Sequence, residues 1–342
     1  DERYAAPRLR AHPPEGSPVS GVTHLEVRPQ DGEVRLDRFL KRYYPQLTQG
    51  RVQKLARTGQ LRVDGRRAEA STRVTPGQTI RVPPLQTDDR PAKPTPDRLS
   101  EADARFVRGL VIHDDGQVVA LNKPAGLAVQ GGPKTPRHLD RLLPALDRDG
   151  ERCRLVHRLD RDTAGLLLLG RGAGPAAHLT EQFRRGRVTK LYWALVRGRV
   201  REPQGMIDLA LLKAGGPGRE RMVGDDDGKP AKTLFRVVAR AGKVATWLAL
   251  RPVTGRTHQL RAHCAAIGHP ILGDPRYPDE RGTLAGRPAG LMLLARAAAL
   301  THPAGRPMTL EAPLSPELAA GFDWLGFAPE AGREHGLEEF AR

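Results

Sequence analysis

A short charged segment between two apolar stretches is the part of this sequence best suited to catalysis. Residues 157–163 read His-Arg-Leu-Asp-Arg-Asp-Thr, and the apolar run 166–169 follows them. Strand-like flanks hold such a loop rigidly, and catalytic groups are often placed on loops that a scaffold fixes. Asp160 lies among arginines, so we expect its pKa to be lowered and its carboxylate to act as a nucleophile or a base.

The same residues allow an interpretation without catalysis. Asp160 and Asp162 would then form surface ion pairs with Arg158 and Arg161, and composition alone does not separate the two interpretations.

Other catalytic patterns fit the sequence poorly. His258, His263, Cys264 and His269 lie close together but lack a zinc-ligand spacing, so we expect no metal site. The glycine cluster at residues 170–174 lacks the spacing and the downstream acid of a dinucleotide-binding loop. The sequence also has neither the Gly-x-x-x-x-Gly-Lys-Ser/Thr motif of nucleotide hydrolases nor the Gly-x-Ser-x-Gly motif of serine hydrolases.

The charged segment resembles the signature of the RluA family of pseudouridine synthases. That signature is His-Arg-Leu-Asp, followed two residues later by Thr-Ser-Gly and an apolar strand, and it is matched by His157, Arg158, Leu159, Asp160, Thr163, Gly165 and residues 166–169. Ala164 replaces the usual serine. Residues 119–129, 190–198 and 252–263 resemble further motifs of the family in the same order, and the likeness extends over residues 110–315. Leu294 departs from the Leu-His-Ala that the family often has before its His-Pro pair.

This resemblance implies isomerisation of uridine to pseudouridine within RNA, and it implies roles for three residues. Asp160 would attack the ribose C1′ or remove the C2′ proton. Tyr192 would stack on the base and assist removal of the C5 proton, and Arg261 would form an ion pair that orients Asp160. The alternatives are an ordinary strand aromatic for Tyr192 and a phosphate contact for Arg261.

The resemblance also implies contacts with RNA. Arg158 would enter the stack that the flipped nucleotide has left, because a base inside a helix does not present its sugar to a side chain. A local salt bridge is the alternative for Arg158. Lys123, Arg256 and His258 are predicted phosphate or base contacts. We expect no cofactor, because isomerisation needs neither redox equivalents nor an activated donor.

The elements that position these residues are mostly strands. Strand-like patterns occur at residues 118–122, 165–169, 188–196, 234–239, 245–250 and 291–300. One helix is predicted over residues 176–185, and a second from near Thr257 that packs Leu260, Cys264 and Ile267 and exposes Arg261. This mixture indicates an α+β fold with a mainly antiparallel sheet. The resemblance implies that this sheet is curved.

A separate basic module is predicted over residues 33–83. Two short helices, the second capped by Thr48, precede a hairpin that turns at Asp64-Gly65 and a further strand at residues 78–82. The module has twelve basic and four acidic residues and resembles the S4 RNA-binding domain. A solvated helix face is the alternative, but such faces mix charges of both signs. The predicted RNA contacts on its helices are Arg38, Lys41, Arg42, Arg51, Lys54 and Arg57.

Bulk composition agrees with an RNA partner. The chain has 342 residues, a net charge of +17 and a sequence pI of about 10.6. Two cysteines and no long apolar run predict a reduced, cytoplasmic protein without membrane association, and a monomer is the default expectation. We divide the chain into an arm that is passive or contacts RNA (1–32), the S4-like domain (33–83), a Pro-rich linker (84–100), the catalytic domain (101–325) and a tail (326–342).

Two function classes remain open at this level. The combination of domains resembles bacterial enzymes that modify large-subunit ribosomal RNA. The rival is a ribosome-assembly factor that kept the fold and binds RNA without catalysis, and the intact set of Asp160, Tyr192 and Arg261 favours the enzyme.

Overall fold

The chain forms two compact units, residues 1–96 and residues 97–342. The structure is a computed structural model, and it describes residues 21–45, 47–85, 99–131, 135–216 and 221–337. Each unit has its own core and is described by itself. None of the helices in these ranges is long and apolar enough to cross a bilayer.

The N-terminal unit is built as the sequence predicts, with two helices and short antiparallel strands. Helix α1 (Leu36–Tyr43) and helix α2 (Gln49–Arg57) pack beside a sheet of order β1-β6-β3-β4. These strands are β1 (Thr23–Glu26), β6 (Thr79–Val82), β3 (Arg62–Val63) and β4 (Arg66–Arg67), and β2 (Val34–Arg35) pairs separately with β5 (Arg73–Val74).

Local chemistry explains where these elements begin and turn. The Thr48 hydroxyl accepts a hydrogen bond from the backbone N–H of Arg51 at 3.3 Å, which confirms the predicted N-cap of α2. Asp64 and Gly65 both have positive φ angles, 47° and 78°, as a two-residue hairpin turn requires. The hairpin prediction is therefore confirmed.

The N-terminal unit begins earlier than residue 33. Strand β1 pairs with β6 over four residues, and Leu25 and Val27 are fully buried in the core of this unit. The last part of the segment that we assigned to the arm (1–32) therefore belongs to the domain. Residues 1–20 of the predicted arm and residues 86–98 of the predicted linker lie outside the described residues.

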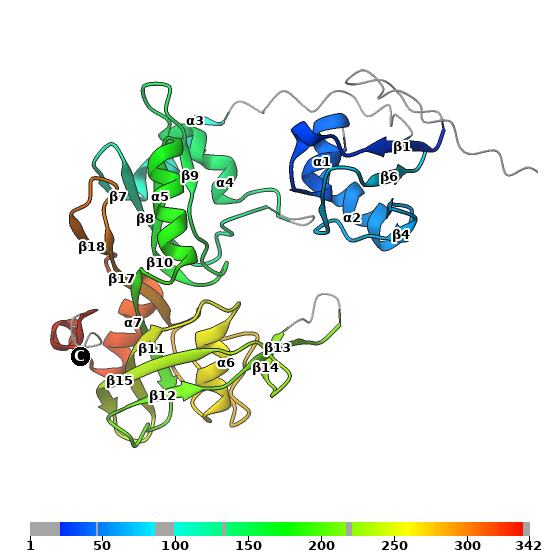
Figure 1. The fold of residues 1–342 in the computed structure, drawn as a ribbon. Coiled ribbons are helices and arrows are strands. Elements are labelled where there is room, and N and C mark those ends of the chain that lie inside the picture. The colour runs from blue at the N-terminus through cyan, green and yellow to red at the C-terminus, as the bar shows by residue number, and fades with distance from the viewer. Residues whose placement is uncertain (1–20, 46, 86–98, 132–134, 217–220, 338–342) are drawn as a thin grey trace, which may run out of the picture. The chain divides into compact units, whose positions relative to one another are not determined.

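The C-terminal unit is organised around one ten-stranded sheet of order β12-β15-β16-β11-β17-β10-β8-β7 (Figure 1). Strand β18 pairs with β17, and β9 pairs with β10. Among the described residues, the pairing of β10 with β17 is parallel and the other pairings in this sheet are antiparallel. The bounds are β7 (Val111–Asp114), β8 (Val118–Lys123), β9 (Cys153–Leu155), β10 (Ala164–Arg171), β11 (Thr189–Arg197), β12 (Gln204–Asp208), β15 (Lys232–Ala241), β16 (Ala245–Pro252), β17 (Leu293–Thr301) and β18 (Pro307–Glu311).

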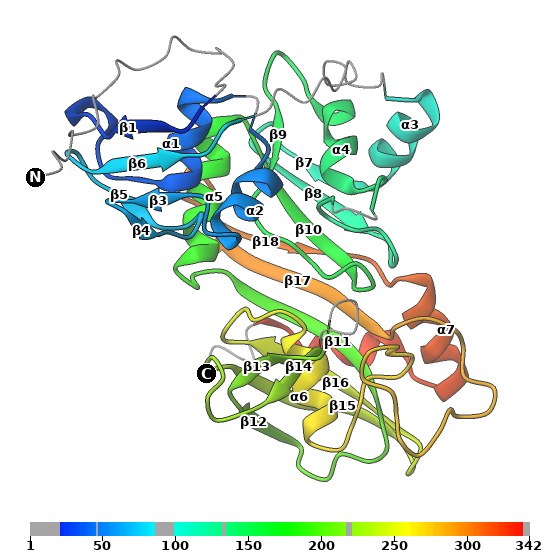
Figure 2. The same cartoon turned by 90° about the vertical axis from the view of Figure 1, so that its right-hand side faces the viewer.

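Strands β11 and β17 are neighbours in the middle of the sheet and join its two halves, which are β12-β15-β16 on one side and β10-β8-β7 on the other. Figure 2 shows β17 as a long strand that extends from one half to the other. The bounds of the helices are α3 (Glu101–Gly109), α4 (Leu139–Leu142), α5 (Ala173–Arg184), α6 (Gln259–Ala266) and α7 (Pro316–Leu325). Short 3-10 turns cover residues 143–146 and 329–335, and β13 (Leu211–Ala214) and β14 (Arg221–Gly224) form a separate hairpin. The six predicted strands and the two predicted helices are present, whereas α3, α4 and α7 were not predicted.

Strand β10 is buried on both faces, which explains its unbroken apolar run. Leu166 and Leu168 pack in the cluster that includes Leu179 of α5, and Leu167 and Leu169 pack in the cluster that includes Leu139 of α4. A strand covered by helices on both sides needs apolar residues at every position rather than at alternate ones.

The start of β10 also needs a glycine. Gly165 has a φ of 108°, and a methyl group at this position would lie 2.3 Å from the carbonyl oxygen of Ala295 on β17. Because a larger residue would separate β10 from β17, Gly165 fixes the loop that precedes it against the sheet.

The C-terminal segment after α7 is not a tail. Phe327 and Leu337 pack against the largest core cluster, and Gly332 is buried against the indole rings of Trp193 and Trp247. The predicted boundary after residue 325 is therefore too early, and the C-terminal unit includes residues up to at least 337.

The contact at Gly332 gives a test of this packing. A methyl group there would lie 2.4 Å from Trp193 and 2.7 Å from Trp247, so Gly332→Ala should lower the free energy of unfolding of the C-terminal unit by about 1–3 kcal/mol. Thermal and chemical denaturation measure this change. The matched control is Gly336→Ala, where the nearest atom is 3.6 Å away and no loss is expected. Equal stability of the two variants would contradict the described packing.

Candidate active site

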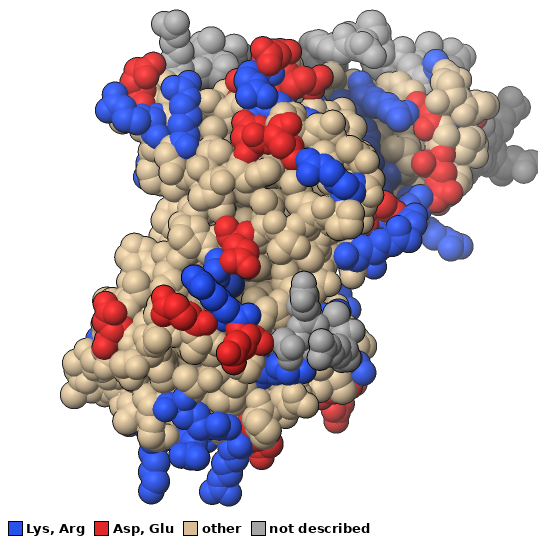
Figure 3. All heavy atoms as spheres, turned by 90° about the vertical axis from the view of Figure 1, so that its left-hand side faces the viewer, with Lys and Arg blue, Asp and Glu red and all other residues tan. Residues whose placement is uncertain are grey.

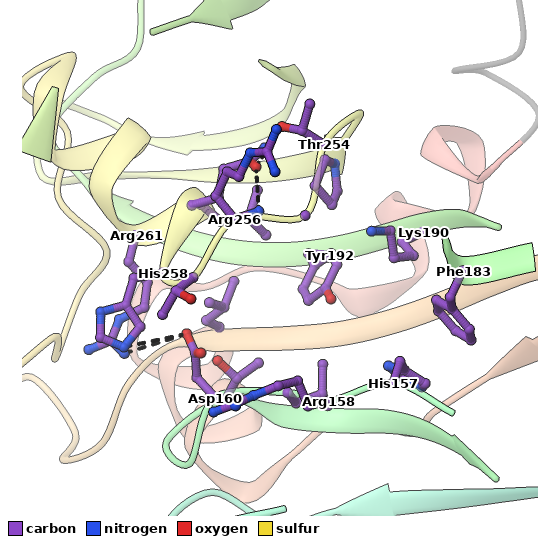
Figure 4. Close-up of a pocket in the computed structure, with 18 of the residues that line it drawn as sticks. His157, Arg158, Asp160, Phe183, Lys190, Tyr192, Thr254, Arg256, His258 and Arg261 are labelled. Carbon is purple, nitrogen blue, oxygen red and sulfur yellow. Dashed lines mark hydrogen bonds and ion pairs between the residues drawn. The ribbon is translucent and has the colours of Figure 1, made fainter. Parts of the chain in front are cut away.

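A pocket of about 460 Å³ opens beside the segment 157–163, between the two halves of the C-terminal unit (Figure 4). Its walls come mainly from the loop before β10, strand β11, and the loop that leads into α6, and the C-terminal part of α5, the start of α6 and the first residue of β17 also contribute. Its volume lies in the range of pockets that hold one small ligand, about 300–1,000 Å³. The predicted residues Arg158, Asp160, Tyr192, Arg256, His258 and Arg261 all line it.

A buried lysine holds the loop that carries Asp160 through hydrogen bonds from the protein interior. Lys123, at the end of β8, has no exposed surface, and its ammonium group donates hydrogen bonds to the carbonyl oxygens of Arg161, Leu127 and Pro124 at 2.8–2.9 Å. Burial lowers the pKa of Lys123 to about 8, against the attraction of the Asp162 and Asp160 carboxylates. The predicted RNA contact of Lys123 is therefore corrected, because this residue supports the loop from inside the protein.

Asp160 faces the pocket and two cationic or polar groups. Its Oδ2 lies 3.7 Å from Nη1 of Arg261 and 3.9 Å from Nε2 of His258, and its side chain is 22% exposed. The competing surface pair of the same loop is also formed, but by its neighbours: Nε of Arg161 donates to Asp162 at 2.9 Å. Asp160 is thus separated from the local ion pair and directed to α6.

Arg261 is buried rather than exposed, contrary to the prediction from helical periodicity. Its side chain is 2% exposed and donates two hydrogen bonds of 2.7 Å to the carboxylate of Asp274, which is itself fully buried. Burial would lower the pKa of Arg261, but the hydrogen bonds and charge of Asp274 raise it above its usual value. Ile267, which we expected in the core, is 37% exposed.

Asp274 was missed by the sequence analysis. It follows Gly273 in a loop, and besides Arg261 its carboxylate accepts backbone hydrogen bonds from Arg276 at 2.8 Å and Tyr277 at 3.2 Å. No periodicity or motif marks such a partner, because the contact joins a helix to a loop thirteen residues away. Its rigid pairing fixes the direction in which the guanidinium presents Nη1 to Asp160.

Tyr192 comes from β11, where a bulge against β17 shifts the register between Leu191 and Tyr192. The extra residue, Arg296, lies on β17, so β11 keeps its regular alternation of side chains; bulges are common beside active sites. Burial, with a smaller contribution from the Asp160 charge, raises the pKa of Tyr192 well above its usual value. The phenol is therefore neutral, and its ring forms a wall of the pocket between Asp160 and Lys190 (Figure 4).

The loop into α6 is shaped by Gln259, a second residue that the sequence analysis missed. The buried Gln259 side chain accepts hydrogen bonds from the Thr254 hydroxyl at 2.6 Å and from the Arg256 backbone at 3.0 Å. His258, next to it, has left-handed backbone angles of φ 51° and ψ 18°, which are uncommon outside glycine. Burial lowers the pKa of His258, so its imidazole is neutral beside Asp160.

Two arginines remain available at the rim. Arg158 is exposed, and its guanidinium forms no hydrogen bond or ion pair with any residue that the structure describes, so the alternative of a local salt bridge is not observed there. Arg256 is exposed and donates to the carbonyl of Pro230 at 3.1 Å. In the N-terminal unit, Arg38, Lys41, Arg42, Lys54 and Arg57 are exposed, and Arg51 is half-buried.

Charge alone does not mark an RNA-binding surface on one face of the C-terminal unit. On the face that Figure 3 shows, basic and acidic side chains are interspersed. No group of three or more His, Cys, Asp or Glu side chains that could hold a metal ion occurs within the described ranges. The pocket is therefore defined by its individual groups: a carboxylate held by a buried cation, a neutral phenol, and exposed arginines.

The pair of Arg261 and Asp274 predicts a specific pattern of stability. Arg261→Met leaves the Asp274 carboxylate buried without a counter-ion, so we expect a loss of about 3–5 kcal/mol in the free energy of unfolding. The double variant Arg261→Met with Asp274→Asn should recover most of this loss, because the amide oxygen still accepts the backbone hydrogen bonds. Denaturant titration compares the two. A double variant as unstable as the single one would contradict the assigned pairing.

Comparisons with known proteins agree with this site. The profile of the RNA pseudouridylate synthase family matches residues 117–266, which include the charged loop, β11 and α6, and the S4 domain profile matches residues 34–80. The solved structure named Human RNA Pseudouridylate Synthase Domain Containing 4 has a TM-score of 0.55 and 27% identity, covering 65% of this chain and 95% of that one.

Curated relatives extend over both units. Ribosomal large subunit pseudouridine synthase C of Escherichia coli strain K12 is 35% identical over 303 residues, which is 86% of this chain and 93% of the relative. The protein of the same name from Vibrio vulnificus is 34% identical over 288 residues, which is 83% of this chain and 90% of the relative. With both domains matched at this identity, the chain belongs to the RluA family of RNA pseudouridine synthases and carries an N-terminal S4 domain.

Proposed function

We propose that this protein isomerises uridines to pseudouridines in large-subunit ribosomal RNA, and that Asp160 performs the chemistry. The substrate is proposed from the shared name of the two relatives, Ribosomal large subunit pseudouridine synthase C. One observation supports the role of Asp160. Its carboxylate lines the pocket and lies 3.7 Å from the buried guanidinium of Arg261, which Asp274 holds in place.

The geometry supports a fixed position for the Asp160 carboxylate beside a buried cation. Two hydrogen bonds to Asp274 fix the Arg261 guanidinium, and Arg261 meets Asp160 through a longer contact of 3.7 Å that leaves the Asp160 carboxylate oxygens open to the pocket. Such a carboxylate is suited to attack the ribose C1′ or to remove the C2′ proton. Both routes break the bond between C1′ and N1, after which the uracil turns and joins C1′ through C5.

The reaction requires that the uridine leave the RNA helix. An extruded nucleotide would place its base on the Tyr192 ring and its sugar at Asp160. Arg158 is suited to occupy the gap, because it is exposed, carries no competing ion pair within the described residues, and has a planar group that stacks on bases. Arg256 and His258 would contact the nucleotide from the other wall of the pocket.

The S4 domain would add affinity through phosphate contacts. Basic residues of α1 and α2 are exposed, and contacts of this kind position an RNA without reading its sequence. Binding and chemistry would thus be divided between the two units.

The role of Asp160 is tested with ribosomal RNA tritiated at uridine C5, where isomerisation releases tritium. Asp160→Asn should slow release by about 10⁴-fold or more while RNA affinity stays nearly unchanged, because the amide is neither a nucleophile nor a base. Asp162→Asn is the matched control, since Asp162 lies on the same loop and pairs with Arg161, and it should retain most of the activity. Normal turnover by Asp160→Asn would refute the assignment.

The role of the S4 domain is tested by charge reversal on α2. The triple variant Arg51→Glu, Lys54→Glu and Arg57→Glu should weaken RNA binding. It should also reduce the slope of log affinity against log salt concentration by about 2–3, since each lost phosphate contact contributes about 0.7–0.9 to that slope. The control reverses Arg62, Arg66 and Arg73, exposed residues on the strands of the same unit. If both triples lose affinity and salt dependence equally, net charge rather than α2 determines binding.

A further inference from the structure

Lys190 is a pocket residue to which the sequence motifs assign no role. It lies on β11 two positions before Tyr192, so both side chains project from the same face of the strand. Figure 4 shows Lys190 beside Tyr192, at the end of the pocket that also holds Phe183 and His157. Its ammonium group lies near the loop before α6, because a methyl group added to Gly255 would be 3.9 Å from Nζ.

Lys190 lacks the partners that the other buried cations of this unit have. Its side chain is partly buried, yet the ammonium group forms no hydrogen bond or ion pair with any residue in the described ranges. By contrast, Lys123 donates to three carbonyl groups, and Arg261 binds Asp274 through two hydrogen bonds. Burial lowers the pKa of Lys190. A desolvated cation without a protein partner, facing a pocket, is suited to an anionic or strongly polar ligand group.

The position of Lys190 indicates that its ligand is the base of the nucleotide rather than a phosphate. The exposed cations Arg158, Arg184 and Arg256 line the pocket where it meets solvent, so they are the ones that a phosphate of the RNA backbone would reach first. Lys190 projects from the sheet beside the Tyr192 ring, on which the base is proposed to stack. A uracil ring presents two carbonyl oxygens, O2 and O4, at its edge.

We propose that Lys190 donates a hydrogen bond to a uracil carbonyl and stabilises the negative charge that the base acquires when it is detached. This inference rests on the proposed function. When the bond between C1′ and N1 breaks, its electron pair stays on the uracil and is delocalised onto N1, O2 and O4. The base then turns, C5 forms the new bond to C1′, the C5 proton is lost, and N1 takes up a proton. Lys190 keeps its own proton throughout.

The charge on the base exists on both routes open to Asp160, so the role of Lys190 does not depend on which one operates. A preorganised donor in a water-poor pocket is effective because it acts where charge develops in the transition state. Removing one such donor commonly slows the chemical step by about 10²–10³-fold.

The first experiment separates charge stabilisation from RNA binding. We compare Lys190→Met with the wild type in single-turnover reactions at saturating RNA, and we measure Kd at several salt concentrations. We expect the rate to fall about 10²-fold or more, with Kd and its salt dependence almost unchanged. Arg256→Met, which removes a rim cation, should instead raise Kd and reduce the salt dependence. The same behaviour in Lys190→Met would overturn the proposal, because it would assign Lys190 to a phosphate.

The second experiment uses the leaving ability of the base. Fluorine at C5 withdraws electrons and stabilises the uracil anion, so RNA that contains 5-fluorouridine should depend less on Lys190. The ratio of wild-type to Lys190→Met rates, measured by consumption of the target nucleoside, should therefore be clearly smaller for 5-fluorouridine than for uridine. Equal ratios would overturn the proposal.

The same series of variants checks the folding of Lys190→Met and the catalytic role of Asp160. Loss of an unpartnered charge should not lower the unfolding temperature of Lys190→Met, and a large decrease would mean that Lys190 has a structural role and would overturn the proposal. If wild type turns over uridine and Asp160→Asn does not, a failed Lys190 result refutes this inference alone. An inactive wild type would instead refute the proposed function.

Discussion

The geometry of the site depends on one buried guanidinium. Arg261 lies on α6, is almost inaccessible, and is fixed by two short hydrogen bonds to a carboxylate that is also buried. A buried charge of this kind is tolerated only when its partners are well placed. Because Asp274 satisfies it, Arg261 faces Asp160 as a fixed positive charge rather than as a mobile side chain, and the carboxylate of Asp160 stays open to the pocket.

The loop that carries Asp160 is fixed by similar means on the opposite side. Lys123 holds the carbonyl of Arg161 from below, and Gly165 lets β10 approach β17 closely directly after the loop. Strand β10 is covered by apolar clusters on both faces, so the loop leads into a strand that is buried along its whole length. The site therefore contains residues from both halves of one sheet, and the pocket lies beside β11 and β17, the paired strands that connect the two halves.

Local patterns made much of this predictable from the sequence. The strands, the turn at Asp64-Gly65 and the cap at Thr48 follow from alternation, turn chemistry and capping, which act between near neighbours. Contacts between distant segments were not predictable in this way. Asp274 and Gln259 have no motif of their own, the burial of Arg261 depends on a loop thirteen residues away, and Lys123 carries a charge that the pattern alone assigned to RNA. The absence of a partner for Lys190 in the described residues also becomes visible only once the pocket is assembled.

The central claim is that a uridine leaves its helix and places its ribose against Asp160. A crystal structure of the Asp160→Asn variant bound to a substrate RNA tests this most directly. We expect an extruded uridine with its base on Tyr192, its C1′ next to residue 160, and Arg158 in the vacated stack. A target uridine that remains stacked in the helix, or a ribose far from residue 160, would contradict it.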